Sequence, residues 1–225
     1  MPVFELSDEL IFPHPKLAEK DGLLAYGGDL CVERLLLAYS NGIFPWYDED
    51  SPIMWWSPNP RMVLFPEKIK ISDSLSRTLR SEKFKVTFDH DFEQVIRRCA
   101  AVQRPGQHGT WIVPEMQEAY IRLYQAGFAH SAETWHEGKL VGGLYGVSLG
   151  RMFFGESMFH LMRDASKVAL VHLVGQLTKW DFHLIDAQQD TEHMRSLGGE
   201  LVSIDRFLEL INNALQYPTI KGKWC

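Results

Sequence analysis

Glu156 is an isolated acid within a run of apolar and small residues. Residues 140–159 read LVGGLYGVSLGRMFFGESMF and contain no other acidic side chain. An ionised carboxylate in such surroundings needs a partner or a shifted pKa. The pattern leaves two alternatives: a surface glutamate on an edge strand, or an acid on the wall of an apolar pocket, the setting in which functional acids occur.

Asp186 and Gln188 form a second candidate pair. They end the apolar run HLIDAQ, residues 183–188, which predicts a short buried strand. Alternation along a strand places the two side chains on one face, where the Asp can hydrogen-bond the Gln and fix the orientation of its amide. A satisfied structural pair at a strand end is the alternative, and the pattern alone does not decide between them.

Several classes of function lack a sequence signature. There is no GxxxxGK[ST] motif and no GxGxxG followed by a helix, so we expect no nucleotide-phosphate loop. The nine histidines do not form HxxxH or HxH pairs, so we expect no metal. Three widely separated cysteines give no disulfide framework. With no signal-peptide pattern and no long apolar run, we expect a cytoplasmic protein without a membrane segment.

Charge is unevenly distributed along the chain. The net charge of −6 divides into −7 over residues 1–60, +4 over 61–104 and −3 over 105–225. Four basic residues lie close together in the middle segment: Arg77, Arg80, Lys83 and Lys85. This stretch is a candidate contact for a phosphate backbone, and an ordinary solvated face is the alternative.

The elements that must position these residues suggest two domains, 1–62 and 63–225. In the first, a helix is predicted over 32–41, whereas residues 42–61, with three Trp and four Pro, are not expected to form a regular element. In the second, alternating segments predict strands and two hairpins, which turn at Glu137-Gly138 and at residues 148–150. Helices are predicted over 72–81, 92–102, 114–126, 165–177 (with Asp164 as N-cap), 192–197 and 204–215, and a loop over 103–109. This mixture indicates an α+β fold.

Several short segments together resemble one family. They are GGDL at 27–30, GIFPW at 42–46 with WWSP at 55–58, GTWI at 109–112, and GESMF at 155–159 with LIDAQ at 184–188. In this order they are similar to the bacterial leucyl/phenylalanyl-tRNA–protein transferases, over about residues 23–215. The resemblance implies a small N-terminal domain followed by a domain of the GCN5-related acetyltransferase type. It also implies transfer of Leu or Phe from aminoacyl-tRNA to proteins with N-terminal Arg or Lys, which marks them for degradation, without acetyl-CoA or another cofactor.

The resemblance also implies roles for individual residues. Trp46, Trp111, Phe153 and Met158, with Ser157 beside them, match family positions around an apolar pocket and the terminal adenosine. Glu156 matches a family acid that would hold either the donor α-ammonium or the acceptor N-terminus. Asp186 and Gln188 match the catalytic pair. A neutral amide is a poor base, so we expect Gln188 to position the attacking amine instead.

The remaining expectations concern partners. The basic stretch from Arg77 to Lys85 would contact the acceptor stem of the tRNA, mainly through phosphates. We expect a monomer, and the sequence does not rank Leu, Phe and Met as donors. Two other functions stay open: an acyltransferase that uses acyl-CoA, and a non-catalytic module that binds peptide or RNA.

Overall fold

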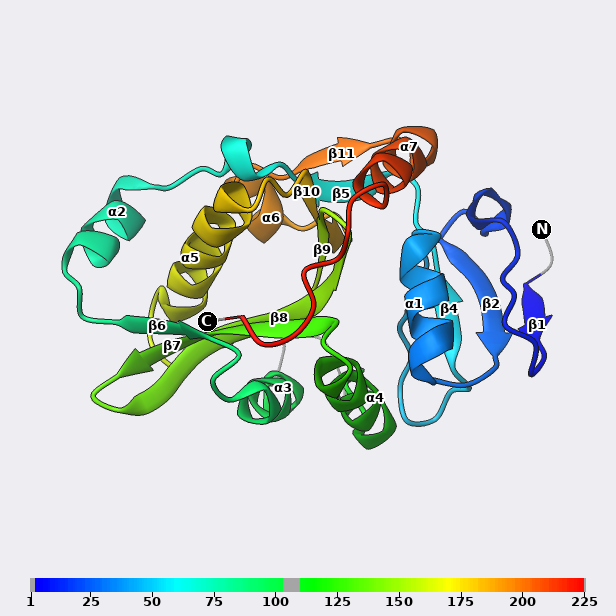
Figure 1. Ribbon diagram of the computed structural model, residues 1–225, viewed down its shortest axis with the longest axis horizontal. Helices are drawn as coiled ribbons and strands as arrows, with labels where there is room; N and C mark the ends of the chain where they lie inside the picture. The colour runs from blue at the N-terminus through cyan, green and yellow to red at the C-terminus, as the bar shows by residue number, and fades with distance from the viewer. Residues whose placement is uncertain (1–2, 103–109, 225) are drawn as a thin grey trace.

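Two β-sheets organise the chain, as seen in a computed structural model that describes residues 3–102 and 110–224 (Figure 1). The predicted loop 103–109 lies outside the described residues. A four-stranded sheet has the order β1-β2-β4-β3, and a seven-stranded sheet has the order β11-β5-β10-β9-β8-β7-β6. The strands of the first sheet are β1 Phe4–Leu6, β2 Leu23–Gly27, β3 Phe44–Pro45 and β4 Met54–Trp56. Those of the second are β5 Arg61–Leu64, β6 Lys85–Phe88, β7 Ala129–His136, β8 Lys139–Leu149, β9 Met152–His160, β10 Leu184–Gln188 and β11 Glu200–Val202.

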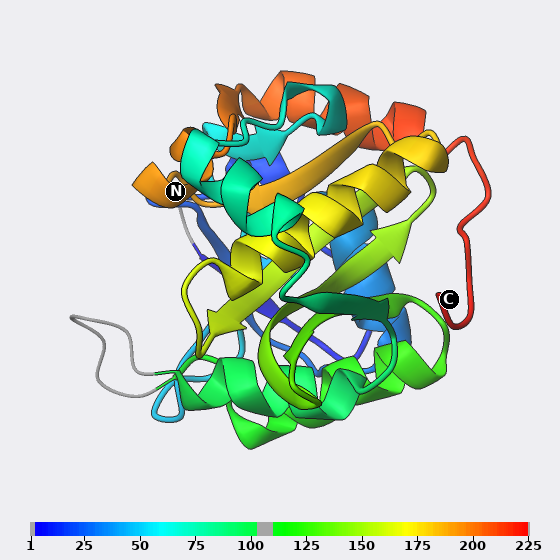
Figure 2. The same ribbon diagram turned by 90° about the vertical axis from the view of Figure 1, so that its left-hand side faces the viewer.

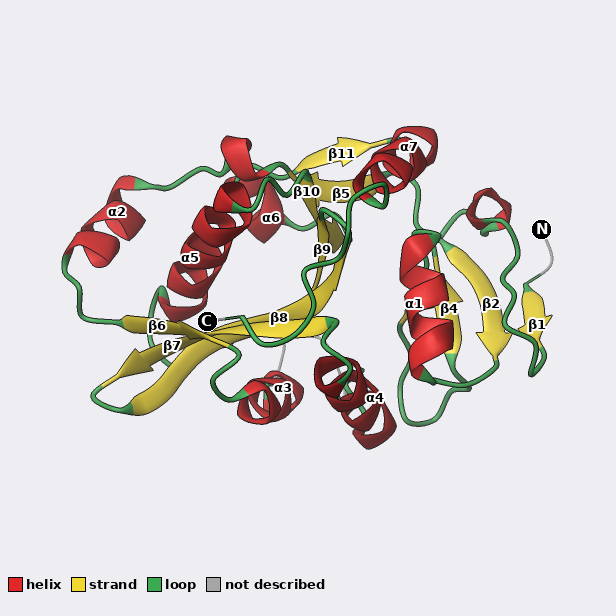
Figure 3. Cartoon of the chain, viewed as in Figure 1, coloured by secondary structure: helices red, strands yellow, loops and turns green. Residues whose placement is uncertain are grey.

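Helices cover both faces of the larger sheet (Figure 3). Helices α3 and α4 pack on one face and α5 packs on the other, so the predicted α+β class is confirmed. The predicted helices are confirmed to within two residues at each end. Their bounds are α1 Val32–Ser40, α2 Asp73–Arg80, α3 Phe92–Ala101, α4 Pro114–Gln125, α5 Ala165–Lys179, α6 Glu192–Ser196 and α7 Ile204–Ala214, with short 3₁₀ turns at Pro15–Leu17 and Pro66–Lys68. In the described part of the chain, no helix has both the length and the apolar character needed to cross a membrane.

Local signals explain most of these elements. Ser72 caps α2 by accepting a hydrogen bond from the backbone N–H of Leu75. The hairpin turn between β7 and β8 falls at Glu137 and Gly138, both with positive φ, which is the backbone geometry of a tight hairpin. The second hairpin turns at Gly150 and Arg151, one residue later than the centre of the predicted turn, because β8 continues to Leu149.

The N-terminal segment differs from its prediction. Residues 42–61 are expected to lack regular structure, and this is wrong: Trp55 and Trp56 lie in β4, which pairs with β2 and β3. The strands are only two to five residues long, too short for an alternating pattern to be visible in the sequence. Trp55 is fully buried and its indole N–H donates to the carbonyl oxygen of Gly27. The tryptophan-rich segment is therefore a packed sheet, not an irregular loop.

A single apolar core joins the two sheets. One cluster of buried side chains runs from Leu24 and Trp55 in the small sheet to residues of α3, α4 and α7 around the large one. Gly42 ends α1 with φ of 73°, and a Cβ there would lie 3.0 Å from the ring of Phe207 on α7. This close approach brings the residue after α1 against α7 and so joins the N-terminal part of the chain to the rest of the core.

Asp164 occupies the predicted N-cap position of α5, but its side chain does not cap the helix. It precedes the helix with φ of 67° and makes no side-chain capping bond. Its carboxylate instead accepts a hydrogen bond from the hydroxyl of Thr78 at 3.0 Å. This contact ties α2 to the start of α5, and Figure 2 shows the two helices side by side.

Candidate active site

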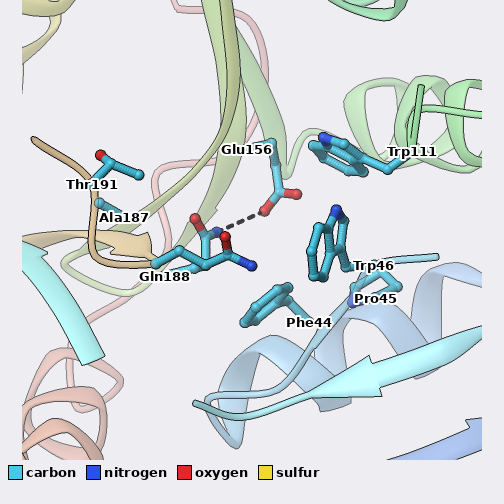
Figure 4. Close-up of a pocket in the computed structure, with 9 residues that line it drawn as sticks. Phe44, Pro45, Trp46, Trp111, Glu156, Ala187, Gln188 and Thr191 are labelled. Carbon is cyan, nitrogen blue, oxygen red and sulfur yellow. Dashed lines mark hydrogen bonds between the residues drawn. The ribbon is translucent and has the colours of Figure 1, made fainter. Parts of the chain in front are cut away.

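The parallel strands β9 and β10 separate at the site. Their last paired residues are Phe154 and Asp186. Beyond this point each strand continues for two residues to a polar side chain, Glu156 on β9 and Gln188 on β10. The amide Nε2 of Gln188 donates to Oε1 of Glu156 at 3.3 Å (Figure 4). The topology therefore brings together two candidates that are 32 residues apart in the sequence.

Two tyrosines hold the carboxylate of Glu156 from the other side. The hydroxyl of Tyr39, on α1, donates to Oε1 at 2.7 Å, and that of Tyr120, on α4, donates to Oε2 at 2.8 Å. The two hydroxyls also contact each other. Burial, followed by the nearby charge of Glu156, raises the pKa of both tyrosines well above their usual value. They therefore stay neutral and act as hydrogen-bond donors.

The environment of Glu156 makes it a weak acid. Burial raises the pKa of its carboxyl from 4.5 to about 7, opposed by the two tyrosine hydrogen bonds. The negative charge of Asp186 raises this pKa and the positive charge of Arg61 lowers it. The side chain is half-buried and still reaches the cavities beside it. An acid with a pKa near the operating pH can both accept and return a proton.

Asp186 is engaged by a buried arginine. Its Oδ1 accepts from Nε of Arg61 at 2.8 Å and its Oδ2 from Nη2 at 2.7 Å, and both side chains are fully buried. The guanidinium lies between the rings of Phe44 and Phe207, 4.7 and 4.6 Å from their centroids. Both carboxylate oxygens are thus held by a fixed cation, and the Asp186 side chain has no exposed surface through which to reach a substrate.

Asp186 orients Gln188 through the backbone. The expected hydrogen bond to the side-chain amide of Gln188 is absent from the described residues. Instead, Oδ1 of Asp186 accepts from the backbone N–H of Gln188 at 2.9 Å. A bulge against β5 lies between the two residues, and Gln188 has φ of 54°, in the left-handed region. A non-glycine residue in this conformation is held by its surroundings, and here they aim the amide at Glu156.

Two cavities meet at Glu156 and Gln188. A cavity of about 210 Å³ is walled by Trp46, Trp111 and Phe44 (Figure 4). A larger one of about 420 Å³ is lined mainly by apolar side chains, among them Phe153, Met158, Leu144, Leu170 and Leu173, and also by Ser157. Both cavities include Glu156 and residues 187–189 in their walls. The structure therefore places all the predicted pocket residues around one centre, in two separate chambers.

The basic stretch lies apart from these cavities. Arg77 and Arg80 are on α2, Lys85 is on the edge strand β6, and all four basic side chains, including Lys83, are exposed. Strands β7 and β8 separate β6 from β9 in the sheet. The stretch thus forms a surface at the β6 edge of the sheet, opposite the β11 edge, and lines neither cavity.

Ser148 stands in a local GxSxG sequence, residues 146–150, but it is not a nucleophile. It lies inside β8, where the chain continues into a hairpin and not into a helix. Its side chain is fully buried, and within the described residues its hydroxyl has no hydrogen-bond partner to act as a base.

Three site residues have no sequence prediction: Arg61, Tyr39 and Tyr120. Arg61 begins a fully buried strand, and an arginine in that position is a signal for a buried acid elsewhere in the chain, here Asp186. The tyrosines have no comparable signal. Tyr39 and Tyr120 occupy inner positions of ordinary amphipathic helices, 81 residues apart.

Comparisons with known proteins agree across the whole chain. The family model described as leucyl/phenylalanyl-tRNA protein transferase matches residues 63–212, and the model of that family's N-terminal domain matches 28–59. A leucyl/phenylalanyl-tRNA–protein transferase from Syntrophobacter fumaroxidans is 63% identical over 211 residues, which cover 94% of this chain and 90% of the relative. One from an Anaeromyxobacter species is 57% identical over 224 residues, covering 100% of this chain and 95% of the relative.

Solved structures match this chain only at low identity and low TM-score. An aminoglycoside acetyltransferase from a soil metagenome matches with a TM-score of 0.39 and 18% identity, covering 49% of this chain and 80% of that chain. L-PGS from Bacillus licheniformis matches with a TM-score of 0.39 and 12% identity, covering 88% of this chain and 61% of that chain. The sequence relatives carry the assignment: this chain belongs to the leucyl/phenylalanyl-tRNA–protein transferase family and is an aminoacyltransferase.

Proposed function

We propose that the chain moves Leu or Phe, and possibly also Met, from aminoacyl-tRNA to the α-amino group of proteins whose first residue is Arg or Lys. The observation that carries this proposal is the meeting of an apolar and an aromatic cavity at the Glu156–Gln188 pair. The larger cavity suits an uncharged donor side chain, because a charged one would lose its hydration there. The tagged product would be directed to degradation, and the enzyme would act as a monomer in the cytoplasm, where charged tRNA is found.

The aromatic cavity is the proposed site of the terminal adenosine of the tRNA. Trp46 and Trp111 line it, and adenine stacks readily on aromatic rings. The ester of the bound nucleotide would then lie near Glu156, with the donor side chain entering the chamber of Phe153, Ser157 and Met158. This arrangement uses the ester of the tRNA as the acyl donor and needs no cofactor.

Chemistry at this centre is aminolysis of an ester. The acceptor nitrogen attacks the carbonyl carbon, the new C–N bond forms, and the bond from that carbon to the ribose oxygen breaks. The nitrogen loses one proton and the ribose oxygen gains one. Glu156, with its pKa near 7, is placed to take the first proton and to supply the second.

Gln188 is the proposed positioning group for the acceptor amine. Its Nε2 is committed to Glu156, so its carbonyl oxygen faces the opposite way and accepts an N–H of the amine. Asp186 keeps the backbone of Gln188 in place, and Arg61 keeps Asp186 in place. In this scheme the Arg61–Asp186 pair acts indirectly, through the geometry of the amide.

The exposed surface of Arg77, Arg80, Lys83 and Lys85 is the proposed contact for the acceptor stem. Its position on α2 and β6 lets a duplex lie over one edge of the sheet while its single-stranded 3′ end reaches the cavities. Phosphate contacts of this kind give affinity that depends on salt and little on base sequence.

Label transfer tests the proposed function. Purified protein is mixed with radiolabelled leucyl-tRNA and a peptide that begins with Arg, and label in the peptide is measured. We expect transfer that requires the free α-amino group, so that an N-acetylated peptide of the same sequence stays unlabelled. A folded protein that binds the tRNA but labels no peptide would show a binding module instead of an enzyme.

A further inference from the structure

A third cavity opens beside the catalytic centre. It has a volume of about 270 Å³ and is lined by three aromatic rings, two carboxylates and two glutamines. The aromatic residues are Phe44, Trp46 and Trp56, the acids are Asp21 and Asp190, and the glutamines are Gln188 and Gln189, with Pro58 and Pro60 completing the wall. Gln188 belongs to all three cavities, so this one connects directly to the place where the amine is proposed to react.

These walls have the chemistry of a cation site. Aromatic faces attract guanidinium and ammonium groups, and carboxylates supply the opposite charge. Phe44 already accepts a guanidinium from the protein itself, that of Arg61 at 4.7 Å from its ring centroid.

Asp21 is the acid that is free to bind a ligand. Its side chain is exposed, and Oδ1 accepts from the backbone N–H of Leu23 at 3.1 Å, while Oδ2 has no partner among the described residues. Asp190 differs, because Arg195 occupies both of its oxygens at 2.6 and 2.5 Å. The charge of Asp190 is therefore largely neutralised, and Asp21 provides the uncompensated charge of the cavity.

Gln188 supplies an independent indication of a ligand. Its side chain is only 8% exposed, its Nε2 donates to Glu156, and its carbonyl oxygen has no partner within residues 3–102 and 110–224. This oxygen is open to the cavities that Gln188 lines, where it can accept a hydrogen bond from a ligand. A ligand with one N–H donor at Gln188 and a cation near Asp21 fits the beginning of a chain whose first residue is basic.

We infer that this third cavity, the acceptor cavity, binds the basic side chain of the acceptor's N-terminal residue, with Asp21 as its charge partner. The inference rests on the proposed function and adds to it the place where Arg or Lys is selected. The α-amino group lies at Gln188, the side chain passes over Trp46 and Phe44, and its charged end reaches Asp21. An internal Arg lacks the α-amino group and cannot make both contacts.

The test compares acceptor peptides with Asp21→Asn. Asparagine keeps the Oδ1 acceptor for Leu23, so the loop around residue 21 retains its hydrogen bond while the charge is removed. Asp50→Asn is the matched control, since Asp50 is also exposed and acidic and lies in the same part of the chain but lines none of the three cavities. Two peptides are used, identical except that one begins with Arg and the other with citrulline, its uncharged isostere.

For the wild-type protein and Asp50→Asn we expect a much lower KM for the Arg peptide than for the citrulline peptide. In Asp21→Asn the KM of the Arg peptide should rise by about fivefold, the size of one solvent-accessible ion pair. The KM of the citrulline peptide and of leucyl-tRNA should stay the same. Asp21→Glu should restore part of the preference.

Two negative outcomes are distinguishable. If the wild-type protein transfers leucine to neither peptide, the proposed function fails. If it transfers leucine to the Arg peptide and Asp21→Asn keeps the full preference for Arg over citrulline, the proposed function stands and the acceptor cavity is wrong.

Discussion

The amide of Gln188 donates to the carboxylate of Glu156 at 3.3 Å, across the point where β9 and β10 part. The two strands run parallel as far as Phe154 and Asp186, and one more step of two residues on each strand reaches this pair. The contact fixes the direction of the Gln188 amide, with its nitrogen toward Glu156 and its oxygen free of that contact. We therefore propose that Glu156 and Gln188 act as one unit, in which the acid moves the proton and the amide positions the amine.

Gln188→Ala should slow transfer without weakening tRNA binding. It removes the acceptor for the incoming amine, a hydrogen bond to a polar or charged group whose loss corresponds to about 10- to 100-fold in rate. Gln188→Glu keeps an oxygen at the same place and should retain part of the rate. Single-turnover transfer is the measurement, with Gln125→Ala, an exposed glutamine at the end of α4, as control. Equal rates in Gln188→Ala and the wild type would remove Gln188 from the mechanism.

The stability of Glu156→Gln relative to the wild type should rise from acid to alkaline pH. The pKa of Glu156 is about 7 in the folded protein, above its usual 4.5, so the folded state binds the proton more tightly. The stability that this group contributes is full below about pH 4.5 and is lost as pH rises through 7. The neutral glutamine avoids this loss, so its advantage should grow by about 2 kcal/mol between about pH 5 and about pH 8.

Urea unfolding of Glu156→Gln and wild type at these two pH values measures the effect. Glu49→Gln, an exposed glutamate in the same chain, serves as the control and should follow the wild type at both. A constant difference between Glu156→Gln and wild type across this range would mean that the pKa of Glu156 is not raised.

Arg61→Met should strongly destabilise the protein. It leaves the buried carboxylate of Asp186 without its cation, and breaking a buried ion pair from one side costs about 3–5 kcal/mol. The double variant Arg61→Met/Asp186→Leu removes both charges and should recover much of that stability. It should remain slow in transfer, because the backbone of Gln188 loses its acceptor. Recovery of activity together with stability would show that the pair has no positioning role.

The basic surface predicts a change in salt dependence. Alanine at Arg77, Arg80 and Lys83 should weaken tRNA binding and reduce the slope of log K against log salt by about 0.9 for each phosphate that the protein no longer neutralises. Alanine at Lys20, Lys179 and Arg206 removes the same charge from exposed positions elsewhere and should leave the slope almost unchanged. Identical slopes in the two triple variants would mean that the basic stretch does not contact the tRNA phosphates.

Sequence patterns predict the larger elements of this fold well and its short ones poorly. The amphipathic helix at 114–126 and the hairpin at Glu137-Gly138 follow from local periodicity and turn residues, and both are present. The sheet that contains Trp55 and Trp56 is built from strands of two to five residues, which carry no readable period. Asp164 has a good capping side chain, but its left-handed backbone and the bond from Thr78 depend on a contact 86 residues away.

The sequence also predicts some residues of the candidate site and misses others. Glu156 is visible because it is an acid among apolar residues, and Asp186 and Gln188 because they end a buried strand. What binds them is not visible: Arg61 is 125 residues from Asp186, and Tyr39 is 117 residues from Glu156. The prediction that Asp186 bonds the side chain of Gln188 is wrong because a bulge and a positive φ turn the backbone N–H toward it. Such contacts depend on the fold as a whole.

The pH dependence of single-turnover transfer from leucyl-tRNA to an Arg peptide tests the central claim most directly. For the wild type we expect a rate that rises with pH with an apparent pKa near 7, that of Glu156, alongside the ionisation of the acceptor amine near 8. In Glu156→Gln the rate should fall, and its pH dependence should show only the ionisation of the acceptor amine. A Glu156→Gln variant that transfers at the wild-type rate with an unchanged profile would contradict the account.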